Sequence, residues 1–163
     1  MKPELKAKFL QHLNQKKQDE GFTLIELLVV IIIIGILAAI ALPTFFGQAS
    51  KAHGAEGKSN VGAMNRAQQV HFFERQVFTT TVDDLGMSFS TSTDNFTYTA
   101  VLQGSTGASN LGTSRKADIK SYGGGTFYAA NTTSTVLCEA NSPGTTAVTV
   151  TTTSCPNGSK ELK

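Results

Sequence analysis

The chain has little charge, and the charge it has is almost evenly balanced. Asp, Glu, Lys and Arg make up 16% of the 163 residues, and the formal net charge is +2. The whole excess lies in residues 1–21, where five lysines face three acids, and beyond them nine basic and nine acidic side chains cancel. A dedicated nucleic-acid-binding domain carries a concentrated basic face, so this neutral body excludes that class.

The sequence also lacks a set of residues suited to catalysis. His12 lies near the N-terminus, while His53 and His71 are eighteen residues apart, about 27 Å along a helix. No phosphate-binding loop, metal-ligand spacing or nucleophile elbow is present. Asp83 and Asp84 are adjacent, but two acids fall short of the ligands that calcium needs. We therefore expect no enzyme, no cofactor and no metal.

In contrast to the scarce charges, a long apolar run occupies residues 27–42, LLVVIIIIGILAAIAL. With its flanks it reaches about 25 residues, where a bilayer needs ~20. Each Leu, Ile or Val favours insertion by roughly 0.3–0.6 kcal/mol, which outweighs the roughly 2.5–3.5 kcal/mol that Glu26 would cost even at a helix centre. We expect a single membrane-spanning helix over residues 22–46, with the lysine-bearing N-terminus in the cytoplasm.

The segment before this helix differs from an ordinary secretory signal. Such signals have an apolar stretch of about 7–15 residues followed by small residues at the cleavage site. Here the apolar stretch is longer, and the small residue, Gly21, precedes it. Cleavage after Gly21 would remove a leader of residues 1–21 and keep the helix.

Glu26 lies four residues after the α-amino group that this cleavage would create on Phe22. On a helix, residues i and i+4 share a face, so the carboxylate could neutralise that amine in its own chain or in a neighbouring one. Such an ion pair would offset the cost of burying the acid and set the register between chains. The alternative is an acid that only reaches for the lipid headgroups.

Two cysteines, Cys138 and Cys155, follow the predicted membrane span. They would lie outside the cytoplasm, where a disulfide is the expected state. They enclose sixteen residues, and closing a loop of that size stabilises a fold by ~3 kcal/mol. No histidine lies nearby at the spacing of a zinc site, so we predict that the two cysteines are bridged.

The remaining sequence, residues 47–163, predicts a globular head of α+β class. Apolar residues recur every three or four positions through residues 44–78, which predicts that one helix continues from Phe22 to about Phe78. Pro43 and Gly35 are expected to weaken or kink it. Phe72, Phe73 and Phe78 are expected in the core. Residues 79–94 predict a loop, and the following stretch predicts an antiparallel sheet of about four strands at residues 96–102, 126–130, 135–139 and 146–153, with a loop between the first two.

The run GFTLIEL, residues 21–27, resembles the prepilin motif of type IV pilins and of the pseudopilins of type II secretion. The match extends through IIGILAAIALP, ending at Pro43. NRAQQVHFFE, residues 65–74, and the long lysine-bearing leader further resemble the major pilins of cyanobacteria. The resemblance implies the type IV pilin fold, a long helix packed on a small sheet, and local loss of helix near Pro43 within a fibre.

The resemblance also implies a life cycle. A membrane peptidase cuts between Gly21 and Phe22 and methylates the new amino group of Phe22. An inner-membrane platform driven by an ATPase then draws subunits from the inner membrane into a helical homo-oligomeric fibre. We expect the subunit of a type IV pilus that serves motility, adhesion or DNA uptake at the cell surface. The alternatives are a pseudopilin of a type II secretion system and a membrane-anchored binding module that never polymerises.

Overall fold

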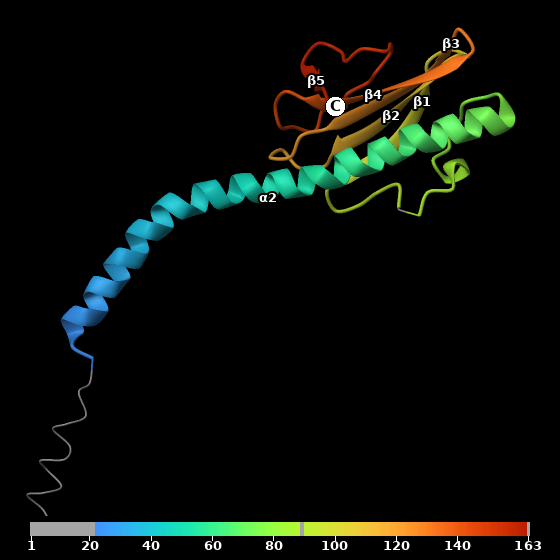
Figure 1. Ribbon diagram of the computed structural model, residues 1–163. Helices are drawn as coiled ribbons and strands as arrows, with labels where there is room; N and C mark the ends of the chain where they lie inside the picture. The colour runs from blue at the N-terminus through green and yellow to red at the C-terminus, as the bar shows by residue number, and fades with distance from the viewer. Residues whose placement is uncertain (1–21, 89, 163) are drawn as a thin grey trace, which may run out of the picture. The chain divides into compact units, whose positions relative to one another are not determined.

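The computed structural model describes residues 22–88 and 90–162. Gly21 and the rest of the expected leader lie outside this range. A long helix and a 3₁₀ turn precede five strands: α2 (Leu24–Arg75), η1 (Asp83–Leu85), β1 (Phe96–Leu102), β2 (Gly107–Ser114), β3 (Tyr122–Ala129), β4 (Thr132–Ala140) and β5 (Ser159–Glu161) (Figure 1). The expected α+β fold is confirmed. The sheet is an antiparallel meander in the order β1-β2-β3-β4-β5, with five strands where about four were predicted.

The chain divides at Phe45 and Phe46 into two units, and α2 contributes to both. In the first unit the helix begins at Leu24, two residues later than predicted. The helical conformation continues through Gly35 and Pro43. The local loss of helix that the resemblance implies concerns the assembled fibre, and it stays a prediction.

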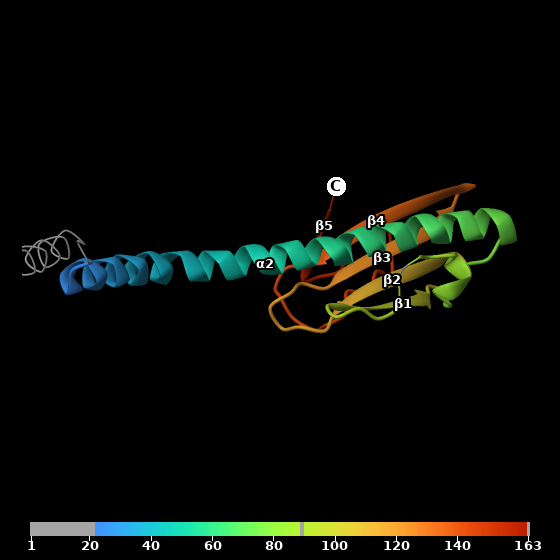
Figure 2. The same ribbon diagram turned by 90° about the horizontal axis from the view of Figure 1, so that it is seen from below.

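In the second unit, α2 packs closely along one face of the sheet, which Figure 2 shows from the helix side. Val61 and Met64 are fully buried there against Phe96. A Cβ atom at Gly57 would lie 2.7 Å from the rings of Phe96 and Tyr122. This glycine therefore permits the close approach of helix and sheet.

The opposite face of the sheet is covered by residues 146–150, so the head has three layers (Figure 1). A Cβ at Gly124 would overlap Asn65 of α2, whereas a Cβ at Gly123 would overlap the backbone of Val148. Because successive residues of a strand point to opposite faces, these neighbouring glycines mark the two sides. Val148 and Val150 pack with Val136 on the outer side.

The predicted strand at 146–153 is therefore wrong. Its alternation is real, since Val148 and Val150 are buried while Thr149 is exposed. However, the segment lies across the face of the sheet instead of pairing along its edge, and its backbone is held partly by side chains. Val150 N–H donates to the Ser109 hydroxyl at 3.0 Å. Alternating burial alone does not distinguish these two arrangements.

The loop predicted over residues 104–125 is also wrong, because it contains β2 and the start of β3. The β2 sequence, GASNLGTS, is rich in residues that are depleted in strands. It nevertheless lies between β1 and β3, and seven of its eight positions are buried. Small and polar side chains fit here because the helix and residues 146–150 both press closely on the sheet.

The end of α2 differs from the prediction in two respects. The helix ends at Arg75 rather than near Phe78, and Gln76 follows with a positive φ of 58°. Phe72 and Phe78 are buried and their rings stack at 4.6 Å, as expected. Phe73 is 62% exposed, so its predicted place in the core is wrong: it follows a buried residue on the helix, where the next side chain turns away.

Candidate functional site

The first turn of α2 is closed by a reciprocal pair of hydrogen bonds between Thr23 and Glu26. The Glu26 carboxylate accepts from the Thr23 backbone N–H at 2.8 Å and from its hydroxyl at 2.7 Å. The Glu26 backbone N–H donates to the Thr23 hydroxyl oxygen at 3.3 Å. This is a capping box: the side chain of the N-cap residue, Thr23, accepts from the backbone N–H of Glu26, and the side chain of Glu26 accepts from the backbone N–H of Thr23. The carboxylate also lies near the positive end of the helix dipole, which stabilises it.

Thr23 is a capping residue of the candidate site that the sequence interpretation missed, although its signal was present. The pattern Thr-x-x-Glu before an apolar run is the sequence signature of a capping box. Because the helix begins at Leu24, Phe22 lies before it and is 83% exposed. The i,i+4 relation between Phe22 and Glu26 therefore does not hold within the helix of this chain, and a pairing of the Phe22 amine stays a prediction.

The Glu26 carboxylate retains capacity for a further donor. A carboxylate offers about four acceptor positions on its two oxygens. Both bonds from Thr23 go to Oε2, and within residues 22–88 and 90–162 Oε1 accepts no hydrogen bond. An ammonium group that approaches from another chain could bind Oε1 without disturbing the cap.

The side chains that follow Glu26 expose apolar surface around the whole helix. Leu24, Ile25 and Ile40 are 88%, 69% and 71% exposed, and no residue from 22 to 46 is buried. Within the described residues, α2 is the single helix long and apolar enough to cross a membrane. Such a surface is stable only in lipid or against other apolar helices.

The predicted disulfide is confirmed. Cys138 of β4 is bonded to Cys155, with 5.7 Å between their Cα atoms. Cys138 is fully buried in the outer cluster with Val148 and Val150. The bridge therefore ties the outer layer and the C-terminal segment to the sheet.

A polar cluster joins α2 to the start of β1. The Glu56 carboxylate accepts hydrogen bonds from Asn95 at 2.9 Å, from Thr93 at 2.6 Å and from Tyr98 at 3.3 Å. Partial burial alone would raise the pKa of Glu56, but these hydrogen bonds hold its pKa below the usual value. His53 Nδ1 lies 3.3 Å from the Asn95 amide nitrogen. These contacts anchor the start of β1 to the helix.

His53 and His71 do not form a catalytic pair. His71 is buried, and its Nδ1 lies 2.8 Å from the Val77 carbonyl, where it supports the turn after α2. In the part of the chain that the structure describes, no three His, Cys, Asp or Glu side chains gather as metal ligands.

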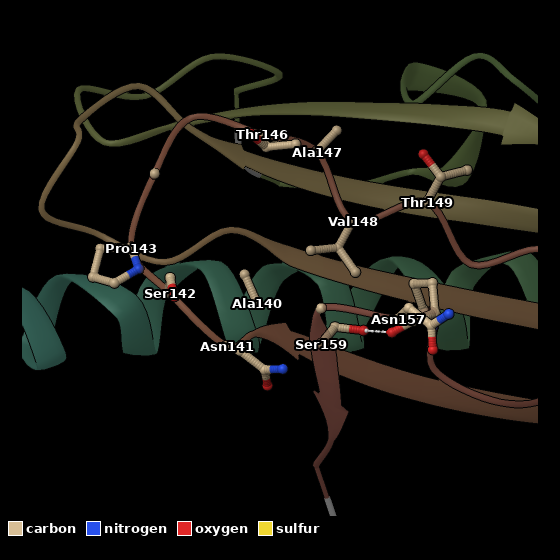
Figure 3. Close-up of a pocket in the computed structure, with 13 residues that line it drawn as sticks. Ala140, Asn141, Ser142, Pro143, Thr146, Ala147, Val148, Thr149, Asn157 and Ser159 are labelled. Atoms are coloured by element: carbon tan, nitrogen blue, oxygen red, sulfur yellow. Dashed lines mark hydrogen bonds between the residues drawn. The ribbon is translucent and has the colours of Figure 1, made fainter.

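Part of the disulfide-closed segment and the turn after it line a hollow of about 520 Å³. Figure 3 shows the side chains around it. Residues 140–144, 146–149 and 156–159 line it, and none of these is charged. The Ser159 hydroxyl donates to the Pro156 carbonyl at 2.7 Å, so it closes a turn. The hydroxyl groups in this hollow therefore have no charged side chain among the lining residues beside them.

Comparison with known proteins identifies the family. Residues 54–160 match the family described as type IV pilin-like G and H, and residues 16–42 match the prokaryotic N-terminal methylation motif. The chain belongs to the type IV pilin-like family. Its members are structural proteins without enzymatic activity.

Curated relatives of this pilin-like chain include both pilins and secretion proteins. The type IV major pilin protein PilA of Myxococcus xanthus is 39% identical over 71 residues, which are 44% of this chain and 32% of PilA. The type II secretion system core protein G of Aeromonas hydrophila is 35% identical over 44% of this chain and 50% of its own length. The fimbrial protein EcpC of Eikenella corrodens is 40% identical over 39% of this chain and 41% of its own length. The matches thus span a third to a half of these relatives, and no solved structure matches.

Proposed function

We propose that this chain is the structural subunit of a type IV pilus, which polymerises through α2 into a surface fibre. The observation that carries the proposal is the apolar first half of α2, whose side chains are exposed on every side behind a capped carboxylate. Helices with this surface can leave the membrane only by packing against one another. The fibre core would consist of such helices, with the heads outside.

The proposal includes processing before assembly. Residues 1–21 are a leader that a prepilin peptidase removes between Gly21 and Phe22, and the enzyme methylates the new amine. The methylation motif over residues 16–42 supports this step. The subunit then waits in the inner membrane with its N-terminus in the cytoplasm, until an assembly platform and its ATPase add it to the fibre. Motility, adhesion or DNA uptake is the expected use, and the resemblance of residues 65–74 to cyanobacterial major pilins stays part of the proposal.

The Phe22 amine freed by cleavage is the partner that we propose for Glu26. Oε1 of Glu26 is the acceptor open to it, while Oε2 remains bonded to Thr23. An amine from a neighbouring subunit would neutralise the carboxylate as both enter the apolar core. The pairing would also set the axial register between subunits, as single buried polar groups do in coiled coils.

A second candidate is a pseudopilin of a type II secretion system, which the similarity to core protein G of Aeromonas hydrophila favours. Both candidates share the leader, the apolar helix and the polymerising role. The C-terminal disulfide between Cys138 and Cys155 favours the pilus, because such a pair is common in pilins.

Electron microscopy of material sheared from cells, followed by mass spectrometry of its subunits, tests the proposal. We expect long thin fibres whose chain begins at methylated Phe22. Gly21→Val should block fibre formation and leave full-length protein in the membrane, because a Cβ at residue 21 would obstruct the peptidase. Fibres with a chain beginning at Met1 would contradict the processing step, and absence of long surface fibres with loss of protein secretion on deletion would favour the pseudopilin.

A further inference from the structure

One flank of α2 forms an open groove with strand β4. Its volume is about 350 Å³, and it is lined by Ala55, Lys58, Ser59, Gly62, Arg66 and Leu137. Three of the lining residues, Ala55, Ser59 and Gly62, are small, and two, Lys58 and Arg66, are cations. Lys58 and Arg66 are eight residues apart on the helix, about 12 Å. The small residues leave room for a narrow chain segment beside two positive charges.

The two cations have no counter-charge of their own. Both are exposed, and within residues 22–88 and 90–162 neither forms an ion pair or a hydrogen bond. The acid on the neighbouring strand, Glu139, is already occupied by Lys120 at 2.7 Å and by Lys160 at 3.8 Å. The groove therefore presents a net positive charge to any molecule that approaches it.

The opposite charge lies on the other flank of the helix. The loop of residues 79–94 contains Asp83, Asp84 and Asp94 and no basic residue. All three acids are exposed. The Asp84 carboxylate accepts one long hydrogen bond, from the Thr79 hydroxyl at 3.3 Å. Asp83 and Asp84 begin the η1 turn, which holds them side by side on a compact projection.

The groove and this acidic loop lie on opposite flanks of α2. The loop is fastened to the helix by Gln68, which donates to the Thr79 carbonyl at 2.6 Å, and by Glu56, which accepts from Thr93. The groove, in contrast, has Leu137 of β4 in its wall. Figure 2 shows β4 on one side of α2, and β1 with the preceding loop on the other. The two charged surfaces therefore face away from each other in one chain.

We propose that the groove binds the Asp83–Asp84 turn of a second copy of this chain, side by side in the fibre. Surfaces on opposite flanks of a subunit form a head-to-tail contact, which leaves one of each surface free and continues into a helical assembly. The inference rests on the proposed polymerisation, and it adds a specific contact between heads to the packing of the apolar helices. A single exposed ion pair is weak. The contact would therefore act by setting the orientation of neighbouring heads, and it would repeat at every subunit of the fibre.

A charge-swap experiment in cells without a wild-type copy tests the contact. Lys58→Glu with Arg66→Glu places four carboxylates together, and we expect at least a tenfold loss of surface fibres. Asp83→Lys with Asp84→Lys should cause a similar loss. The four changes combined restore opposite charges with exchanged signs and should recover most of the fibres. Lys51→Glu with Arg75→Glu is the matched control, since it alters net charge equally on two exposed cations outside the groove that form no ion pair within residues 22–88 and 90–162, and its fibres should stay normal.

A second measurement on wild-type fibres avoids variants that fail to fold. A carbodiimide joins an amine and a carboxylate only when they are in contact, so treated fibres should yield dimers with an amide between Lys58 and Asp83 or Asp84. Dimers joined only elsewhere would overturn the proposal. Normal fibres from the Lys58→Glu, Arg66→Glu variant would also overturn it. If those normal fibres had lost binding to DNA, the groove would be assigned to a nucleic acid. Absence of wild-type fibres would instead count against the proposed function itself.

Discussion

Glu26 combines two tasks that different substitutions can separate. Its side chain caps the first turn of α2 through Thr23, and its charge is available to a second amine through Oε1. Glutamine keeps a side-chain oxygen that can accept from the Thr23 N–H but removes the charge. Thr23→Ala keeps the charge but removes the hydroxyl that completes the cap.

We predict that charge rather than capping controls assembly. Glu26→Val and Glu26→Gln should both insert and lose their leader, yet accumulate as processed subunits in the inner membrane with few or no fibres. An unpaired buried amine costs several kcal/mol. Thr23→Ala should lose only about 1 kcal/mol of helix stability and still form fibres. Glu26→Asp, with its shorter reach, should form an intermediate number of fibres. Cell fractionation and microscopy measure both outcomes; normal fibres from Glu26→Gln would show that the charge is not needed.

Glu56 should make the thermal stability of the head fall as the pH drops below about 4.5. Its pKa in the folded head lies below the ordinary 4.5, because hydrogen bonds from Asn95, Thr93 and Tyr98 outweigh the effect of burial. A depressed pKa contributes stability that is fully present above the unfolded value and is lost as pH falls through the folded value. Wild type should therefore unfold at a higher temperature than Glu56→Gln near pH 7, and the gap should narrow below about pH 4.5. A gap that is constant from pH 7 to pH 3 would contradict this assignment.

At the scale of the elements, the closeness of α2 to the sheet explains why glycine is used within a helix. Each interior glycine costs about 1 kcal/mol relative to alanine, so a glycine without a packing reason is a weak point. Gly57 has such a reason, since a Cβ would meet Phe96 and Tyr122 at 2.7 Å. Gly62 does not, because its nearest neighbours, Arg66 and Leu137, would lie 3.9 Å from a Cβ.

Alanine at these two positions should have opposite effects. Gly57→Ala gains about 1 kcal/mol of helix propensity but overpacks the core, which typically costs about 1–3 kcal/mol, and the rings of Phe96 and Tyr122 have little room to yield. Gly62→Ala should stabilise the head by up to about 1 kcal/mol. Thermal unfolding of the full chain in detergent, followed by circular dichroism, compares them. Equal midpoints for the two variants would argue against the close approach.

For the molecule as a whole, the disulfide fastens the third layer of the head. Residues 146–150 pair with no strand and are held on the sheet by Val148, Val150 and the bridge from Cys155 to Cys138. Cys138→Ser should destabilise the head by about 2–5 kcal/mol and lower the subunit yield. Alkylation of wild type without reduction should label neither cysteine, and free thiols in fibre material would refute the bridge in the mature subunit.

The sequence by itself determined those parts of the protein whose signal is local. The apolar run and the 3.6-residue period of α2 depend only on neighbours along the chain. So does the Thr-x-x-Glu signature of the cap, although the sequence interpretation missed it. Strand β1 was predicted with the bounds that it has, because Phe96, Tyr98 and Ala100 alternate with exposed or half-buried residues. The disulfide followed from the compartment and from the presence of two cysteines. Most of the candidate assembly site was therefore readable before the fold was known.

Only the tertiary structure decided which segments form strands of the sheet and which segments cover one of its faces. Strand β2 has no alternating pattern because both of its faces are covered, so Ser109 and Asn110 are equally buried. Residues 146–150 alternate like a strand but lie across the outer face. The groove at Lys58 and Arg66 and the separation of the acidic loop from it are likewise absent from the linear pattern. In each case the burial of a residue depends on elements distant in sequence, and the folded chain alone brings them together.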